Sequence, residues 1–115
     1  MNELQELTAK VLAFREARDW RQFHNPKDMA LSLTLEAAEL LEVFQWKEGD
    51  AIAQTAAARK ADIADELADI FSWLLLMSHD LGIDLASALQ AKLVANEKKY
   101  PVDKSRGSSR KYTEY

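Results

Sequence analysis

The sequence lacks cysteine entirely and has only three glycines and two prolines among its 115 residues. The absence of cysteine excludes both a disulfide framework and a metal site built from thiolates. Long hydrophobic runs are missing as well, because charged residues interrupt the apolar stretches before they reach the length of a membrane span or a signal peptide. These absences predict a soluble cytoplasmic protein that does not associate with a membrane.

A surplus of basic residues is also missing. The formal net charge is -4, whereas a surface for duplex nucleic acid needs a basic face that displaces counterions from phosphates. We therefore expect no nucleic-acid partner, although a small anion fits if a metal ion supplies local positive charge. With 48% hydrophobic residues, the chain fits one domain whose small core would be enlarged by association of subunits.

Between the few glycines and prolines, apolar residues recur at helical spacing rather than in alternation. This pattern predicts an all-α protein, a four-to-five-helix bundle with no sheet. The predicted helices run from about Asn2 to Asp19, from a cap at Asn25 to Gly49, from a start between Asp50 and Arg59 to just before Gly82, and from a cap at Asp84 to Tyr100-Pro101. Residues 1–101 form the predicted helical domain, and residues 102–115 form a polar tail that is either flexible or in contact with another subunit.

The second predicted helix carries carboxylates where core side chains are expected. On a helix, Glu36 lies beside Leu40 and Val43, and Glu39 lies beside Val43 and Trp46. An amphipathic helix that serves only to pack would place apolar residues at these positions. The two glutamates therefore need a partner that this helix does not provide.

The third predicted helix is apolar nearly all round, except for an acidic stripe that contains Asp62, Glu66 and Asp69. If consecutive helices fold as antiparallel hairpins, Glu36 lies level with Asp69 and Glu39 lies level with Glu66. The anomalous carboxylates of two helices thus meet at the same height. Acidic residues early in a helix also favour its dipole, which is the simpler explanation for Asp62 and Glu66.

The fourth predicted helix begins with an apolar stripe and then turns polar. Leu85 and Leu89 are followed on the same face by Lys92 and Asn96, and Tyr100 lies one turn further. A second fold near residue 83 brings these three residues close to the height of the acidic stripe. One polar pocket built from three helices would account for all the misplaced side chains.

Four carboxylates among apolar walls must be protonated, paired or bound to a cation. Two of them about 4 Å apart repel by roughly 4 kcal/mol at an effective dielectric near 20. Oxygen ligands without cysteine or histidine favour Mg2+, or Mn2+ as a substitute, over zinc. Magnesium held by carboxylates keeps positions open for water and phosphate oxygens, so a phosphorylated ligand is expected.

The spacing Glu36-x-x-Glu39, followed 27 residues after Glu39 by Glu66-x-x-Asp69, resembles the metal-binding signature of the all-alpha nucleoside triphosphate pyrophosphohydrolases, the MazG-like and dUTPase-like superfamily. Three longer segments resemble its dCTP pyrophosphatase branch along most of the chain: "FREARDWRQFHNPKDMALSLTLEAAELLEVFQWK", "DELADIFSWL" and "KLVANEKKYPV". The resemblance implies cleavage of a nucleoside triphosphate, with dCTP or a modified dCTP as substrate, to the monophosphate and pyrophosphate. The implied role is cleansing of the nucleotide pool.

The resemblance also implies roles for individual residues, which stand as expectations. Mg2+ would be held by Glu36, Glu39, Glu66 and Asp69; catalysis would rest on Glu39, which orients the attacking water as a base, and on Glu36; phosphates would be bound by Lys92, Asn96 and Tyr100; and the base would be bound by Trp20, His24, Trp46 and Trp73. A homodimer or homotetramer is implied, with residues of a second subunit completing each base pocket. Trp73 stands where dCTP-preferring members carry tyrosine, which leaves the base preference open.

Two other functions fit parts of this pattern. A non-catalytic helical module could keep the acidic cluster for metal-assisted stability while its bundle binds a partner. A di-iron carboxylate bundle needs Glu-x-x-His pairs, and neither histidine of this chain follows a glutamate by three residues. The tryptophans and His24 also have simpler explanations, as core side chains or as local hydrogen-bonding groups.

Overall fold

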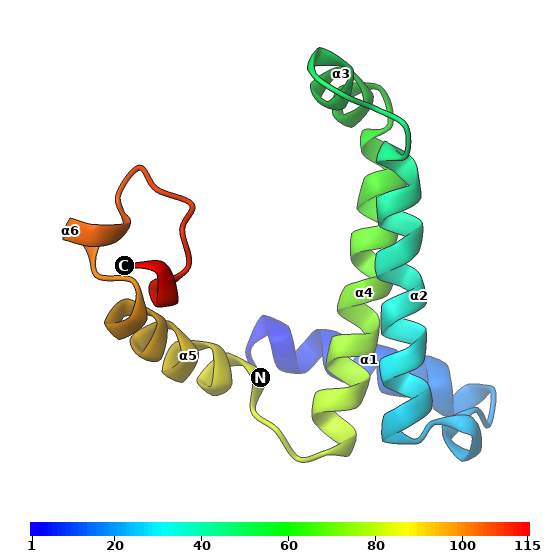
Figure 1. The fold of residues 1–115 in the computed structure, drawn as a ribbon. Helices are drawn as coiled ribbons and strands as arrows, with labels where there is room; N and C mark the ends of the chain where they lie inside the picture. The colour runs from blue at the N-terminus through cyan, green and yellow to red at the C-terminus, as the bar shows by residue number, and fades with distance from the viewer. The chain divides into compact units, whose positions relative to one another are not determined.

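The computed structural model describes residues 1–115 and contains helices but no strand, which confirms the all-α prediction. The elements are α1 (Glu3–Ala17), the 3-10 turn η1 (Arg21–Phe23), α2 (Pro26–Phe44), α3 (Asp50–Ala58), α4 (Lys60–Asp80), α5 (Leu85–Lys99), α6 (Val102–Ser105) and the 3-10 turn η2 (Tyr112–Glu114) (Figure 1). They form two compact units, residues 1–82 and residues 83–115, and each is described by itself. None of the helices combines the length and the apolar character needed to cross a bilayer.

Two predicted helix starts are built as the sequence indicates. The Asn25 side chain accepts a hydrogen bond of 2.8 Å from the backbone N–H of Asp28, and Pro26 occupies the first helical position of α2. The Asp84 side chain caps α5 by accepting a bond of 3.1 Å from the N–H of Ser87. Because each cap satisfies a backbone donor that the helix leaves free, these residues fix where α2 and α5 begin.

The segment between α2 and α4 differs from the prediction. Helix α2 ends at Phe44 rather than at Gly49, and Trp46 has a left-handed φ of 67° just beyond it. The predicted third helix is two helices, because α3 ends before Arg59 and α4 starts after it. Residues 50–60 contain neither glycine nor proline, so the periodic pattern carries no mark of this break.

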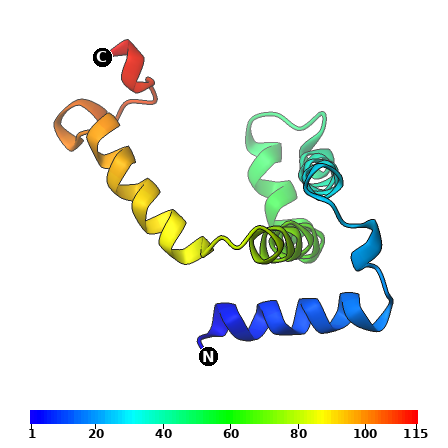
Figure 2. The ribbon, with the colours of Figure 1, turned by 90° about the horizontal axis from the view of Figure 1, so that it is seen from below.

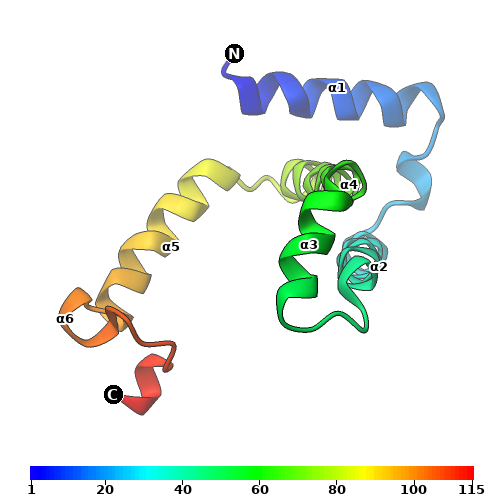
Figure 3. The ribbon, with the colours of Figure 1, turned by 90° about the horizontal axis from the view of Figure 1, so that it is seen from above.

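The core of the first unit lies where α2 and α4 run side by side, as all three views show (Figures 1, 2 and 3). Helix α1 runs across α4 near the C-terminal end of that helix (Figures 1 and 2). The buried apolar side chains are Met29 and Val43 of α2 and Leu75 and Leu76 of α4. Full burial of one such side chain contributes about 1.5–3 kcal/mol, so this short list makes a small core.

Large apolar side chains remain exposed on the same helices. On α2 these include Leu31, Leu35 and Leu41, which are 55–70% exposed, and on α4 Leu67 and Phe71 are 51% and 38% exposed. Apolar surface gathered on neighbouring turns is typical of a face that another protein covers. The expected association into a homodimer or homotetramer stays a prediction.

In the second unit, the polar tail folds back on the end of α5. The Tyr100 ring contacts the Tyr112 and Tyr115 rings edge to face, with centroids 5.8 and 6.0 Å apart. The Lys99 ammonium lies 5.1 Å from the centre of the Tyr112 ring, and the Ser105 and Tyr115 hydroxyls are hydrogen-bonded. Within its own unit the tail is thus an ordered cap on α5, and contact with another subunit stays a prediction.

Candidate functional site

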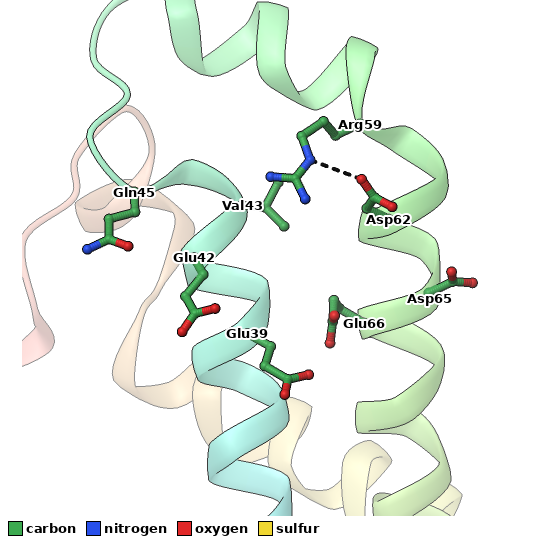
Figure 4. A pocket seen from close by; sticks show the side chains of 8 residues that line it. All are labelled: Glu39, Glu42, Val43, Gln45, Arg59, Asp62, Asp65 and Glu66. Carbon is green, nitrogen blue, oxygen red and sulfur yellow. Dashed lines mark hydrogen bonds and ion pairs between the residues drawn. The ribbon is translucent and has the colours of Figure 1, made fainter.

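Three of the four predicted metal ligands meet between α2 and α4. Glu36, Glu39 and Glu66 each offer a carboxylate oxygen, and these oxygens lie within 4.8 Å of one another. Figure 4 shows Glu39 of α2 and Glu66 of α4 facing each other across the gap between the helices. The antiparallel pairing predicted from the sequence brings these residues together, and Asp69 lies close enough for its charge to act on Glu36 and Glu66.

The acidic cluster is not satisfied by the chain itself. One oxygen of Glu36 and one of Glu66, Oε2 in both, are buried and have no hydrogen-bond partner. Removal from water raises the pKa of Glu36 to about 7, helped by a proton-sharing contact with Glu39 and by the charges of Glu39, Asp69 and Glu66. Loss of hydration, and then Glu39, raise the pKa of Glu66 in the same way. The cluster therefore needs protons or a cation.

The residues present fit a divalent cation with a preference for oxygen. The donors are carboxylate oxygens only, and they are supplied by α2 and α4, which pack against each other. A cation between Glu36, Glu39 and Glu66 would reduce their mutual repulsion and give the two buried oxygens a partner. The set lacks the sulfur and imidazole ligands typical of zinc, so Mg2+ or Mn2+ is the matching ion.

A cavity of about 460 Å³ opens beside the cluster (Figure 4). It is lined by Glu39, Glu42, Val43, Gln45, Arg59, Asp62, Asp65 and Glu66. Arg59 donates from Nε to Asp62 Oδ2 over 3.0 Å, and its guanidinium reaches toward the space between α2 and α4, whereas Asp65 points away from Glu39 (Figure 4). Arg59 is a candidate phosphate contact that the sequence analysis missed, because it lies at the unmarked break between two helices.

A second cavity of about 280 Å³ contains three of the four predicted base-binding residues. Its lining is Val11, Phe14, Arg15, Trp20, His24, Asp69, Ser72, Trp73 and Leu76. The His24 and Trp73 rings meet edge to face at 5.1 Å, and the Phe14 and Trp20 rings do so at 5.9 Å. Asp69 belongs to this lining and also acts on the acidic cluster, so the aromatic cavity adjoins the carboxylates.

The fourth predicted base-binding residue is elsewhere. Trp46 is 89% exposed beyond the end of α2 and does not line the aromatic cavity. Lys92, Asn96 and Tyr100 follow one face of α5 and its C-terminal cap, which belong to the second unit. Their predicted meeting with the acidic cluster stays a prediction.

An ion pair between Arg15, which lines the aromatic cavity, and Asp80 was not predicted. Arg15 is only 5% exposed, and it donates two hydrogen bonds to Asp80, of 2.8 Å from Nη1 and 2.9 Å from Nη2. Hydrogen bonds from Arg15 hold the pKa of Asp80 below its usual range, and the Arg21 charge adds to this effect. The available signal was that Arg15 stands four residues after Val11, on the apolar face of the first helix.

Comparison with known proteins gives a consistent result. The model of the MazG-like family matches residues 31–115. The chain is 36% identical to dCTP pyrophosphatase 1 of Bos taurus over 96% of its length, and 37% identical to dCTP pyrophosphatase 1 of Homo sapiens over the same share. It spans about two thirds of these relatives, 67% and 66% of their lengths. The crystal structure of a pyrophosphatase from Archaeoglobus fulgidus superimposes with a TM-score of 0.85 at 35% identity, covering 88% of this chain and 94% of the other.

Proposed function

This chain belongs to the MazG-like family, and from that premise we propose that it is a Mg2+-dependent nucleotide pyrophosphohydrolase that cleaves dCTP or a modified dCTP to the monophosphate and pyrophosphate. The observation that carries the proposal is the trio Glu36, Glu39 and Glu66, which offer carboxylate oxygens within 4.8 Å of one another and leave one buried oxygen of Glu36 and one of Glu66 without a partner. The names of the relatives support the reaction and the base.

The acidic cluster is the proposed metal centre. Glu36, Glu39 and Glu66 would hold Mg2+, with Asp69 as the fourth ligand of the set. Bound Mg2+ would supply positive charge that neutralises phosphate oxygens and makes a water molecule more acidic. Mn2+, which prefers the same oxygen ligands, is the expected substitute.

Glu39 is the proposed base. It is the exposed member of the carboxylate trio and lines the 460 Å³ cavity, whereas Glu36 and Glu66 each turn one oxygen into the interior. Glu39 would accept a proton from a water molecule as the water oxygen attacks the α-phosphorus. The bond between that phosphorus and the bridging oxygen breaks, and pyrophosphate leaves with the electron pair.

Binding of the phosphates is assigned to basic and polar groups. The sequence-based assignment names Lys92, Asn96 and Tyr100. Arg59 is added because it lines the acidic cavity and because Asp62 accepts from only one of its guanidinium N–H groups. These groups would hold the leaving pyrophosphate while the carboxylates hold the cation. Positioning of this kind supplies much of the rate in phosphoryl chemistry.

The aromatic cavity is the proposed site of the base. Trp20 and Trp73 offer ring faces and edges against which a base can pack, and His24 offers a ring nitrogen to its edge. The exposed Trp46 is assigned to the base pocket of a second subunit, in a homodimer or homotetramer. This assignment explains why a large aromatic side chain lies so open in a single chain.

The test is product analysis with ribo- and deoxyribonucleoside triphosphates, including dCTP and 5-methyl-dCTP, in Mg2+ and in excess chelator. We expect metal-dependent release of monophosphate and pyrophosphate in equal amounts. Release of orthophosphate would move the attack to the terminal phosphorus and overturn the mechanism. Turnover that persists in chelator would remove the metal centre from the proposal.

A second candidate is a non-catalytic, metal-stabilised helical module. The unpartnered carboxylate oxygens favour metal binding whether or not chemistry follows. This alternative predicts that Mg2+ raises the melting temperature while no triphosphate in the panel is turned over. The first candidate predicts both effects in the same preparation.

A further inference from the structure

A network of ion pairs within the first unit includes Arg15, which lines the aromatic cavity. Arg15 of α1 and Asp80 at the end of α4 are joined by two bonds, of 2.8 and 2.9 Å, with side chains only 6% and 5% exposed. Arg21 Nη1 reaches the same carboxylate over 3.2 Å. The three charged groups thus tie α1 and the turn η1 to the end of α4.

The same residues fix the backbone that carries two cavity side chains. Arg21 Nη1 donates to the carbonyl oxygen of His24 over 3.0 Å. The backbone N–H of Trp20 donates to the carbonyl oxygen of Arg15 over 3.2 Å. The loop between α1 and α2 therefore presents Trp20 and His24 to the cavity from a fixed position.

Arg15 also contacts the His24 ring. Its Nη1 lies 3.5 Å from Nδ1 of the ring, and a guanidinium group can only donate. Nδ1 must then be the acceptor, so the single proton of the neutral ring lies on Nε2. Loss of hydration, followed by the Arg15 charge, lowers the pKa of His24, which favours the neutral ring.

We propose that Arg15, oriented by Asp80, is a positioning residue that holds His24 in the tautomer with its proton on Nε2, so that the cavity recognises a base edge offering a hydrogen-bond acceptor. This inference rests on the proposed function only for the identity of the ligand as a nucleotide. Nε2 makes no hydrogen bond within the chain and is free to donate to a ligand. A carbonyl oxygen or an unprotonated ring nitrogen, as on the edge of cytosine, is the matching partner.

A purely structural role for the Arg15–Asp80 pair makes a different prediction. An ion pair that only joins α1 to α4 would contribute to the stability of the fold but would leave the tautomer of His24 unaffected. The position of the ring proton separates the two roles, and it can be measured without turnover. The chain has only two histidines, so a protein with ¹⁵N-labelled histidine gives a simple spectrum that His79→Gln assigns.

The experiment is ¹⁵N NMR of the full chain at pH 7.5, with dCMP and its 3-deaza and 2-thio analogues as probes. We expect the wild-type His24 ring to show the neutral form with the proton on Nε2 alone. The analogue that removes or weakens the acceptor contacted by Nε2 should bind about three- to tenfold more weakly than dCMP, as expected for the loss of one hydrogen bond. An imidazolium ring, or a proton on Nδ1, would overturn the proposal.

The variant is Arg15→Met combined with Asp80→Leu, because apolar replacement of both partners of a buried ion pair is tolerated far better than removal of one. We expect an averaged signal of the two tautomers and loss of the discrimination between dCMP and the weaker analogue. If the variant folds and keeps both the single tautomer and the discrimination between dCMP and the weaker analogue, the ion pair has only a structural role and the proposal is overturned. Glu16→Gln, an exposed change one residue from Arg15, should match the wild type.

If the variant does not fold, the wild-type tautomer and the analogue affinities still decide. If the wild type turns over no triphosphate, the proposed enzyme fails, but the ring signal and dCMP binding are unaffected by that result. Equal affinity for dCMP and both analogues would overturn the recognition by Nε2, even in an active enzyme. The two failures are therefore distinguishable.

Discussion

Helix α4 carries a carboxyl group with at least one buried oxygen near each of its ends, and the two groups differ in whether the chain supplies hydrogen-bond partners. Near the N-terminal end, Glu66 meets Glu36 and Glu39, and two oxygens of this trio have no partner in the chain. At the C-terminal end, the Asp80 carboxylate is bonded by Arg15 and approached by Arg21. The first cluster needs protons or a cation, whereas the second is complete within the chain.

The pKa directions express the same difference. Burial and like charges raise the pKa of Glu36 and Glu66, so their charged forms are disfavoured. Hydrogen bonds from Arg15 lower the pKa of Asp80, so its charged form is favoured. An unsatisfied cluster is a place for a ligand, and a satisfied one is a support for the residues around it.

The largest expected effect comes from removing a ligand of the unsatisfied cluster. Glu39→Gln and Glu66→Gln should each lower kcat/KM for dCTP by roughly 100-fold or more, because loss of a carboxylate would weaken the proposed metal site. Steady-state assays of pyrophosphate release measure the effect, and circular dichroism shows whether the fold is kept. The control is Glu16→Gln, since Glu16 is an exposed carboxylate of α1 that lines neither cavity. Wild-type activity in Glu39→Gln would contradict the assignment.

Removal of a residue from the satisfied cluster should instead lower the free energy of unfolding. Asp80→Ala leaves Arg15 buried without its partner, and breaking a buried pair in this way costs about 3–5 kcal/mol. Urea unfolding measures the change. The contrast is Asp62→Ala, which breaks the exposed pair with Arg59 and should cost no more than about 1 kcal/mol. Similar losses in the two variants would mean that burial does not distinguish the two ion pairs.

Removal of one carboxylate from the unsatisfied cluster should raise the free energy of unfolding, whereas removal of Asp80 should lower it. In excess chelator at pH 8, Glu36→Gln should stabilise the protein by about 1 kcal/mol, allowing for solvent screening, because it removes a charge that burial disfavours. Thermal unfolding should show a rise of roughly 4 °C, and the stabilisation by Mg2+ should disappear. Glu42→Gln, an exposed change on the same helix, is the control. A destabilised Glu36→Gln in chelator would show that the cluster is satisfied without metal.

Much of the unsatisfied cluster was predictable from the sequence, and the satisfied one was not. Helical periodicity and an antiparallel pairing folded about the middle of the connection suffice to place Glu36, Glu39 and Glu66 at one height. The pairing holds although the connection, residues 45–59, contains α3. Arg15 and Asp80 are 65 residues apart, and periodicity does not indicate which buried charges pair across a fold. The break at Arg59 was missed because the backbone changes direction there without glycine or proline. The exposure of Trp46 was not predicted either, because periodicity does not show that α2 ends at Phe44.

The smallest expected effect is the pH dependence of stability. In chelator, the folded-state pKa of Glu36 is about 7 against 4.5 for the free side chain, so between these values the folded protein binds more protons than the unfolded chain. Stability should therefore fall as the pH rises from about 4.5 to 7, and it should level off above that range. Asp80 acts oppositely and in a different window, since its stabilisation is complete above its ordinary value of 3.8 and is lost only below it. Melting curves from pH 5 to 8 thus exclude the Asp80 contribution. His24, whose pKa is lowered from 6.5, makes stability rise with pH in this window, so curves of a His24→Gln protein are needed to isolate the acidic cluster.

If the trio is the proposed Mg2+ site, saturating Mg2+ should reverse the slope of these curves, because stabilisation by a metal that binds deprotonated carboxylates grows with pH. The Glu36→Gln protein should show a flatter profile than the wild type in chelator. A His24→Gln melting temperature in chelator that rises from pH 5 to 8 would mean that the trio is ionised and stabilised without a cation, because the opposing contribution of His24 is then absent. The contrast between the two clusters of α4 would then disappear, together with the physical reason for placing the metal between α2 and α4.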